Sequence, residues 1–320
     1  MTPKLLITRT LPDRVVTRAL TRYDVTLRED LDPLTEAQAL AALYDHDAVL
    51  ATLGDAFTAE VFEQAPAPRC RIVANFGVGY NHINVDAART AGVVVSNTPG
   101  AVTDATADIA MTLLLMTARR AGEGERLVRA GQWTGWQPTQ MLGLHVTGKR
   151  LGIVGMGRIG KAIARRAHFG FGMQIAFYNR SRIDDPGVPA TQVDSLADLM
   201  GACDCVVIAV PGGAGTHHLI DAEALAALQP HAILVNIARG DVVDEAALIA
   251  CLQQRRIAGA GLDVYEREPE VPEALRALEN VVLLPHLGTA ALEVREAMGL
   301  MALDNLDAFF DGHEVPNRVG

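Results

Sequence analysis

Arg150-Leu-Gly-Ile-Val-Gly-Met-Gly-Arg-Ile-Gly160 is the stretch that decides the fold of this chain. Its apolar start predicts a strand, and the small and apolar residues that follow the last glycine recur at helical spacing. A second apolar run, Met173 to Tyr178, predicts the next strand. The glycines therefore lie in a strand–turn–helix–strand unit, which is the setting in which a Gly-x-Gly-x-x-Gly sequence binds a dinucleotide.

Each glycine of this unit has a physical task. Gly155 permits the tight turn, Gly157 lets the backbone approach a pyrophosphate, and Gly160 lets the helix pack against the strand. The first N–H groups of the helix and its partial positive charge then attract phosphate. A tight turn without a ligand is the alternative, and the complete flanks favour the binding site.

The end of the second predicted strand indicates which dinucleotide is bound. A site for NAD usually carries Asp or Glu there, about 20 residues after the glycines. This chain has Asn179-Arg180-Ser181-Arg182, and the first acid is Asp184. Guanidinium groups and a hydroxyl suit a 2′-phosphate, which a carboxylate would repel. We therefore predict that NADPH is preferred and that NADH remains possible; a merely solvated loop is the alternative.

Composition limits the classes of protein to consider. A chain of 320 residues suggests two domains, and a net charge of −10 argues against nucleic acid or an anionic membrane as partner. The start of the sequence has no signal-peptide layout, and the apolar run Ile109 to Ala118 is too short to span a bilayer. The four cysteines lack zinc-ligand spacing and are typical of a reducing compartment. We expect a cytoplasmic protein.

Short apolar runs alternate with helical patterns along the whole chain, which predicts an α/β fold with parallel sheets. The glycine fingerprint comes only after about 150 residues, so a small α/β domain precedes it. A helix, Thr289 to Phe310, remains after the last predicted strand. We expect two Rossmann-like doubly wound domains: a flavodoxin-like substrate domain, 1–99 plus 288–320, and an inserted dinucleotide-binding domain, 100–287. The predicted elements include a helix at 102–120 and strands at 5–8, 25–27, 48–51, 72–74, 93–96, 151–154, 174–178, 206–210, 232–237, 260–264 and 281–284.

Three polar residues follow consecutive strands of the second predicted domain. Arg239, Glu268 and His286 each come shortly after an apolar run. Because the carboxyl ends of parallel strands meet at one edge of a sheet, we expect these side chains to converge where ligands bind. Arg239 can grip a carboxylate, and His286 can exchange a proton with a carbonyl oxygen. Glu268 would favour the protonated imidazole, and no metal is needed.

The loop Asn75-Phe-Gly-Val-Gly-Tyr-Asn-His82 follows another predicted strand. Its glycines leave backbone N–H groups accessible, an arrangement that can bind a carboxylate without a charged side chain. A flexible turn explains the spacing equally well. Among the other histidines, we expect no partner for His46, His145, His168, His231 and His313.

These motifs together resemble the D-isomer-specific 2-hydroxyacid dehydrogenases over essentially the full length of the chain. The matching segments are Asn75 to Gly79, Gly148 to Gly160, Val235 to Asp244, Gly261 to Tyr265 with Glu268-Pro269, and Leu284 to His286. The resemblance implies that Arg239 binds substrate, that Glu268 assists and that His286 is the acid–base residue. It also implies that Val78 and Gly79 bind the substrate carboxylate through their backbone and that the product has D stereochemistry.

The resemblance further implies a set of cofactor contacts that extends beyond the fingerprint. The residues assigned to the cofactor are Thr106, Gly155, Met156, Gly157, Arg158, Ile159, Gly160, Asn179, Arg180, Ser181, Arg182, Val210, Pro211, Thr216, Ile237, Ala238, Asp263, His286 and Gly288.

Within the family, the chain is similar to the glyoxylate/hydroxypyruvate reductase branch through Asp104 to Asp108, Gly131 to Trp136 and Asn179 to Arg182. This similarity implies a homodimer in which Trp136 reaches the active site of the partner subunit and limits substrate size. We expect NADPH-dependent reduction of small 2-keto acids, hydroxypyruvate to D-glycerate and glyoxylate to glycolate. A 2-ketogluconate reductase is a near alternative. A nucleotide-sensing binding protein like the corepressors of this fold is an alternative of another class, although no basic or disordered tail favours it.

Overall fold

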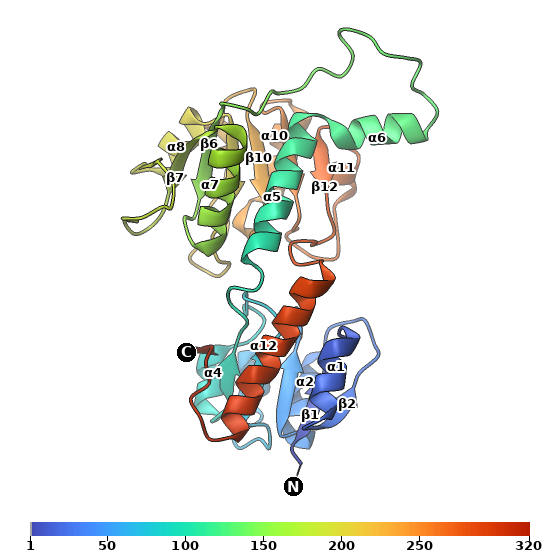
Figure 1. Cartoon of the computed structure of the whole chain (residues 1–320), viewed down its shortest axis with the longest axis vertical. Helices are drawn as coiled ribbons and strands as arrows, with labels where there is room; N and C mark the ends of the chain where they lie inside the picture. Colours follow the sequence, from blue (N-terminus) through green and yellow to red (C-terminus); the bar gives the residue numbers. More distant parts are fainter. Residues whose placement is uncertain (1) are drawn as a thin grey trace. The chain divides into compact units, whose positions relative to one another are not determined.

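The computed structural model describes residues 2–320 and divides the chain into two compact units. Unit 1 comprises Met1–Val102 and Thr289–Gly320, and unit 2 comprises Thr103–Gly288. Each unit is a parallel α/β structure with helices on both faces of its sheet (Figure 1). The predicted fold class is therefore confirmed. The functional names that the sequence analysis gave to the two domains stay predictions.

Unit 1 contains a sheet of six strands in the order β13-β5-β4-β3-β1-β2. The five parallel strands have the flavodoxin-like order, and the short β13 joins antiparallel to β5. The strands are β1 (Lys4–Ile7), β2 (Asp24–Leu27), β3 (Ala48–Ala51), β4 (Ile72–Asn75), β5 (Val94–Ser96) and β13 (Arg318–Val319). The helices are α1 (Asp13–Leu20), α2 (Glu36–Asp45), α3 (Ala59–Glu63), α4 (Val85–Thr90) and α12 (Leu292–Phe310).

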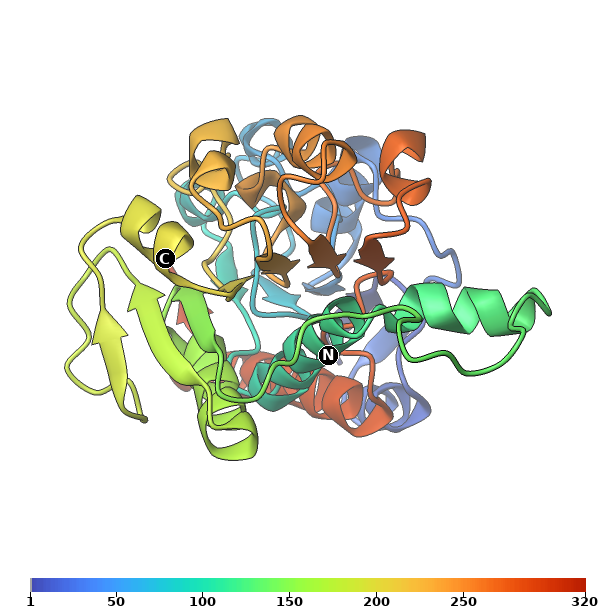
Figure 2. The same cartoon turned by 90° about the horizontal axis from the view of Figure 1, so that it is seen from above.

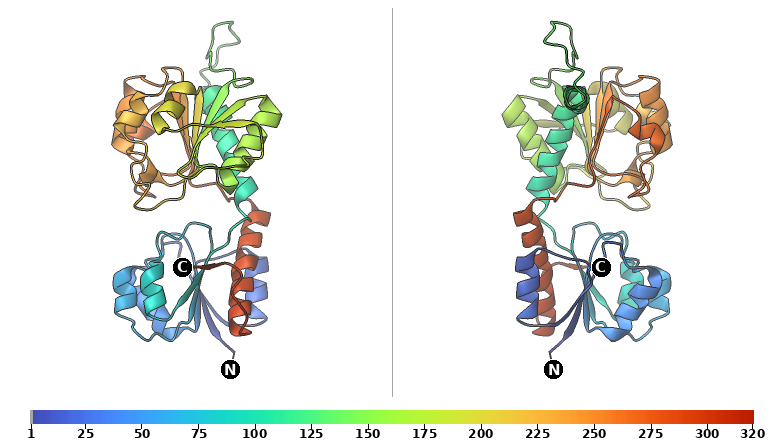
Figure 3. Two further views of the ribbon diagram at one scale, coloured as in Figure 1. Left: turned by 90° about the vertical axis from the view of Figure 1, so that its left-hand side faces the viewer. Right: turned by 90° about the vertical axis from the view of Figure 1, so that its right-hand side faces the viewer.

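Alternating side chains of these strands build two apolar layers. Leu5 and Ile7 point toward α1 and α12, whereas Leu6 faces the layer of α2, α3 and α4. Figure 3 shows α1 and α12 side by side on one face of this sheet. Strands buried on both faces are typical of parallel sheets covered by helices.

Unit 2 contains seven parallel strands in the order β12-β11-β10-β9-β6-β7-β8. The order reverses between β6 and β9, and ligands bind doubly wound folds at such a point. The strands are β6 (Arg150–Val154), β7 (Gln174–Tyr178), β8 (Ala190–Gln192), β9 (Cys205–Ile208), β10 (Ile233–Asn236), β11 (Gly259–Leu262) and β12 (Val281–Leu283). The helices are α5 (Thr103–Ala118), α6 (Ala121–Arg129), α7 (Arg158–Phe171), α8 (Leu196–Ala202), α9 (Ala222–Ala226), η1 (Gly240–Val242), α10 (Glu245–Gln253) and α11 (Glu273–Arg276).

Two separate cores stabilise unit 2. Helices α5 and α7 cover one face, and α8 to α11 cover the other (Figure 2). Close approach of α5 to the sheet requires small residues: a Cβ on Gly261 would lie 2.9 Å from the Cβ of Leu113. Within the described residues 2–320, no helix is long and apolar enough to cross a membrane.

Several element boundaries differ from the sequence-based ones. The strands expected to reach Val210 and Val264 end at Ile208 and Leu262, because the apolar run continues past the last paired residue into the loop that follows each strand. The last helix begins at Leu292 rather than Thr289, since the chain first makes a turn in which the Ala291 N–H donates to the Thr289 carbonyl at 2.8 Å. The sequence does not predict β8 and β13 because their residues, Ala-Thr-Gln and Arg-Val, form no apolar run.

Candidate active site

The glycine fingerprint lies between β6 and α7, as its sequence predicts. Gly155 has φ +99°, and a Cβ there would lie 2.9 Å from the Ala209 backbone. A Cβ on Gly160 would lie 2.2 Å from the Gly155 carbonyl oxygen, so both glycines are required by packing. By contrast, a Cβ on Gly157 would meet no atom within 4 Å. The space in front of the first turn of α7 is therefore open, which fits the approach of a pyrophosphate.

The loop after β7 is tied to this turn by Asn179. Its Oδ1 accepts a hydrogen bond from the Met156 N–H at 3.2 Å, and its Nδ2 donates to the Ser181 Oγ at 3.1 Å. Arg180, Ser181 and Arg182 are exposed. Arg182 lies 3.4 Å from Asp184, so Arg180 is the cation of this loop that has no acid beside it in the described residues. The site can thus attract a phosphate but presents no carboxylate to ribose hydroxyls.

Gln192, the last residue of β8, makes hydrogen bonds that fix the same loop, and no motif in the sequence predicts this role. Its Nε2 donates to the Ser181 carbonyl at 3.0 Å, and its Oε1 accepts from the Ile183 N–H at 3.0 Å. The sequence does not predict this contact, because the residues of β8, Ala-Thr-Gln, show no apolar pattern.

His286 and Glu268 form a direct pair at the carboxyl edge of the sheet of unit 2. The His286 Nδ1 lies 2.8 Å from the Glu268 Oε2, and both side chains are about one-third exposed, 31% and 30%. Glu268 is held in turn by the Tyr265 N–H, which donates to its Oε1 at 3.1 Å. The Nδ1 contact leaves Nε2 as the ring nitrogen that can face a substrate.

The charge of Glu268 is maintained by its neighbours. Burial by itself raises the pKa of Glu268, but the hydrogen bond and charge of His286, the Tyr265 N–H and the charge of Arg239 bring the pKa below its ordinary value. The carboxylate therefore stays ionised at neutral pH and stabilises a protonated imidazole.

Asp263 fixes the turn that carries His286. Its carboxylate accepts from the N–H groups of Leu287 and Gly288 at 2.6 and 2.8 Å, and its carbonyl accepts from the His286 N–H at 2.9 Å. The Asp263 residue is 1% exposed. Burial raises its pKa, although the bonds from the two N–H groups act in the opposite direction. His286 has φ +54°, a conformation that non-glycine residues rarely adopt outside constrained sites. Thr106 donates to the Gly288 carbonyl at 3.2 Å and secures the other end of the turn.

Arg239 follows β10, the strand next to β11 in the sheet. Asn236 holds the backbone here, because its Nδ2 donates to the Arg239 carbonyl at 2.9 Å. Burial lowers the pKa of Arg239, while Glu268 and Asp241 oppose that effect. A half-buried guanidinium near Glu268 can bind an anionic substrate at short range.

The other residues of unit 2 that the sequence assigns to the site lie in loops after its strands and after α6. Thr216 donates to the Pro211 carbonyl at 2.8 Å in the loop after β9, and Ile237 and Ala238 are buried after β10. Trp136 is 80% exposed on the irregular segment after α6, which leads away from the sheet (Figure 1). In unit 1, Val78 and Gly79 are half-buried in the loop after β4.

The prediction that the other histidines lack partners was wrong for two of them. The His168 Nδ1 lies 3.1 Å from the Met173 carbonyl oxygen. The His231 Nε2 lies 2.7 Å from the Asp204 Oδ1. The two residues are distant in sequence and meet at the amino ends of β9 and β10, which spacing alone does not reveal.

Comparison with known proteins defines the class to which this fold and site belong. Residues 111–288 match the model of the D-isomer-specific 2-hydroxyacid dehydrogenase NAD-binding domain. The chain belongs to the D-isomer-specific 2-hydroxyacid dehydrogenase family, in its glyoxylate/hydroxypyruvate reductase branch, and is a nicotinamide-dependent oxidoreductase.

Individual relatives agree along the whole chain. The chain is 45% identical to a glyoxylate reductase of Thermococcus kodakarensis, with 100% of this chain and 96% of the relative covered. It is 38% identical to a glycerate dehydrogenase of Hyphomicrobium methylovorum, covering 98% and 97%. The crystal structure of an NADPH-dependent glyoxylate/hydroxypyruvate reductase of Sinorhizobium meliloti, in complex with NADP and malonate, superposes with a TM-score of 0.89 at 38% identity and covers 100% of this chain and 97% of its own.

Proposed function

We propose that the protein is an NADPH-dependent reductase of hydroxypyruvate and glyoxylate, yielding D-glycerate and glycolate. The observation that carries the proposal is the His286–Glu268 pair at 2.8 Å with the half-buried Arg239 on the next strand end. The names of the relatives support the substrate class. Unit 2 is then the nucleotide-binding domain, and unit 1 is the substrate domain.

Each residue of the site has a separate role in the proposed reaction. Arg239 binds and orients the 2-keto acid through its guanidinium, and the N–H groups of Val78 and Gly79 bind the carboxylate. The bound nicotinamide cofactor supplies a hydride. His286 donates its proton from Nε2 to the carbonyl oxygen, and Glu268 stabilises the imidazolium before transfer and keeps the ring oriented. Asp263 holds the backbone turn beneath His286.

The residues that would hold the cofactor fit it. Gly157 leaves open space before α7, and the remaining fingerprint residues, Met156, Arg158 and Ile159, border that turn. Arg180 would take the 2′-phosphate, with Ser181 beside it and Asn179 in place of the usual acid. We therefore propose that NADPH is preferred over NADH.

We also propose a homodimer. Large apolar side chains stand exposed on α6 and the segment after it: Val128 at 59%, Trp133 at 54%, Trp136 at 80% and Leu142 at 68%. Exposed apolar groups concentrated on one segment indicate a protein interface. In the dimer, Trp136 would limit the size of the substrate in the partner subunit.

The test is a cofactor oxidation assay with NADPH and NADH in parallel, using hydroxypyruvate, glyoxylate and 2-ketogluconate. Fast turnover of the two- and three-carbon acids with NADPH is expected. Arg180→Ala should raise the KM for NADPH about tenfold and leave that for NADH unchanged, since a charged hydrogen bond is lost. Preference for 2-ketogluconate would refute the substrate assignment, and equal efficiency with NADH would refute the cofactor assignment.

A further inference from the structure

In the loop that follows β4, side-chain amides donate hydrogen bonds to the carbonyl oxygens of Gly77, Val78 and Gly79. The Asn75 Nδ2 donates to the Gly77 and Gly79 oxygens at 3.0 Å each. The Asn97 Nδ2 donates to the Val78 oxygen at 2.9 Å. A further N–H, that of Thr98, donates to the Gly77 oxygen at 3.0 Å. Each carbonyl oxygen of Gly77, Val78 and Gly79 thus accepts at least one hydrogen bond from the protein.

Two of the three donors of the same loop are left open, whereas the Gly77 N–H donates to the Asn75 carbonyl at 3.0 Å. Among residues 2–320, the N–H groups of Val78 and Gly79 have no acceptor, although both residues are half-buried. In a trans peptide the C=O of one residue and the N–H of the next point in opposite directions. The contacts to the Gly77 and Val78 oxygens therefore set the directions of the Val78 and Gly79 N–H groups. Two neighbouring N–H groups oriented in this way form a site for an anion.

Asn97 is itself fixed by the last helix of the chain. The Asn305 Nδ2 donates to the Asn97 carbonyl at 3.1 Å, and the Asn97 N–H donates to the Asn317 carbonyl at 3.1 Å. The Asn305 Oδ1 accepts from the Asn317 N–H at 3.1 Å. Asn305 is 0% exposed and Asn97 is 8% exposed. Both polar ends of the Asn305 side chain are thus paired, and such a buried network favours one geometry for Asn97.

We propose that Asn75 and Asn97 are positioning residues for substrate recognition, which orient the N–H groups of Val78 and Gly79 toward the carboxylate, and that Asn305 keeps Asn97 in place. The inference rests on the proposed function, in which those N–H groups bind a 2-keto acid. The side chains are neutral, so they orient the donors without adding a charge that would compete with Arg239 for the carboxylate.

The experiment replaces each positioning amide by an acid of the same size. In Asn97→Asp and Asn75→Asp, a carboxylate oxygen faces a carbonyl oxygen, so the loop loses its orientation. We expect the KM for hydroxypyruvate and glyoxylate to rise about tenfold or more, with a smaller change in kcat and the KM for NADPH within about twofold. Loss of stability alone would not produce this division between the two KM values.

The matched control is Asn84→Asp in the same unit. Asn84 is exposed and caps α4 by accepting the Ala87 N–H at 2.9 Å, a task that Asp performs equally well. This variant should keep the KM values of the wild type. If Asn97→Asp does not fold, Asn97→Ala removes the donor without adding charge and should raise the KM of the keto acid about threefold.

A second measurement follows the loop directly. Amide hydrogen exchange of the peptide covering residues 76–80 is compared with and without oxalate in the presence of NADP+. Oxalate should slow exchange in the wild type and in Asn84→Asp, and it should have little effect in Asn97→Asp.

The outcomes separate the two proposals. A wild-type enzyme that reduces 2-keto acids, together with an Asn97→Asp variant of unchanged KM and unchanged oxalate protection, overturns the positioning role and leaves the proposed function standing. A wild-type enzyme that reduces none of the acids and shows no oxalate protection overturns both.

Discussion

At the scale of single residues, His286 unites an unusual backbone conformation with a charged partner. Its φ of +54° is maintained by three hydrogen bonds to Asp263, and its ring orientation is maintained by Glu268. The surrounding groups thus over-determine one imidazole position, which is how strained conformations persist in folded proteins.

Replacing His286 by Ala should remove proton transfer and leave the cofactor site intact. We expect kcat for hydroxypyruvate to fall by about 10²- to 10⁴-fold, with the Kd for NADPH unchanged. Steady-state rates and fluorescence titration of NADPH check this. His231→Ala is the matched control, because His231 pairs with Asp204 at the opposite edge of the same sheet. A variant at His286 with near-normal kcat would contradict the assigned role.

Glu268→Gln should change how stability depends on pH, because Gln keeps the size of the side chain but loses its negative charge. The folded pKa of Glu268 lies below its ordinary value of 4.5, so its contribution to stability is present above that pH and is lost as pH falls through the folded pKa.

The melting temperatures of wild type and Glu268→Gln, measured across pH, test this prediction. Their difference should be constant above about pH 5 and should shrink in more acidic solution. A difference that grows on acidification would show that Glu268 is not held in its ionised form by the fold.

At the scale of elements, α7 is capped by Gly157, a glycine whose missing side chain is needed for binding and not for packing. A Cβ on Gly157 meets nothing within 4 Å, so Gly157→Ala should fold and lose only the stability that Ala costs at an N-cap, about 1 kcal/mol. The Kd for NADPH should rise at least about tenfold, because the methyl group occupies the space of the pyrophosphate. Gly170→Ala, also in open space but late in α7, should bind NADPH normally. Equal affinity of Gly157→Ala and wild type for NADPH would show that the pyrophosphate does not bind at this position.

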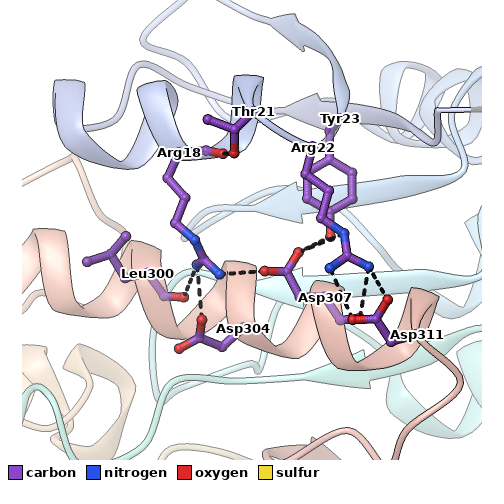
Figure 4. A network of polar contacts seen from close by, with 8 residues as sticks. All are labelled: Arg18, Thr21, Arg22, Tyr23, Leu300, Asp304, Asp307 and Asp311. Carbon is purple, nitrogen blue, oxygen red and sulfur yellow. Dashed lines mark hydrogen bonds and ion pairs between the residues drawn. The ribbon is translucent and has the colours of Figure 1, made fainter.

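Helices α1 and α12 are joined by a network centred on Asp307 (Figure 4). Its carboxylate accepts from the Tyr23 hydroxyl at 2.5 Å and pairs with Arg18 and Arg22. Burial and the bond to Asp307 raise the pKa of Tyr23 above its ordinary value, so the phenol remains a donor. The network secures the helix that carries Asn305.

Asp307→Ala should lower the free energy of unfolding of unit 1 by about 1–3 kcal/mol, because the Tyr23 hydroxyl loses its acceptor and Arg18 and Arg22 each lose one of their partners. Asp304→Ala removes a pair in which Asp304 is 63% exposed, and it should cost no more than about 0.5 kcal/mol. Calorimetric melting of both variants distinguishes them; equal effects would mean that the Tyr23 contact contributes nothing.

The sequence predicts the elements whose signal is local and misses those that depend on distant partners. Apolar runs such as Ile72 to Asn75 mark strands, and the glycine spacing marks the turn before α7. The order of strand ends also predicts that Glu268 and His286 share an edge. Gln192, Asn97 and Asn305 carry no such signal, because an isolated amide has no period and its value comes from partners far away in the chain.

At the scale of the whole molecule, we expect two chains to associate through α6 and the segment after it. Sedimentation should give twice the mass of one 34.1-kDa chain. Val128→Glu should shift the protein toward the monomer, because it places a charge among the exposed apolar groups of that segment. Leu31→Glu, at an 83% exposed position of unit 1, should remain dimeric. A wild-type protein that sediments as a monomer would contradict the proposed interface.

The division of unit 1 between the two ends of the chain has a consequence for biosynthesis. Residues 103–288 form unit 2 without a break, whereas unit 1 needs α12 and β13 from the last 32 residues, Thr289–Gly320. A ribosome releases the amino-terminal part first, and domains generally fold as units. We therefore expect the first hundred residues to remain incompletely folded, with the apolar face of β3 and β4 that α12 covers exposed, until α12 has been synthesised. Nascent chains stalled before Leu292 would then depend on chaperones for the segment that was made first.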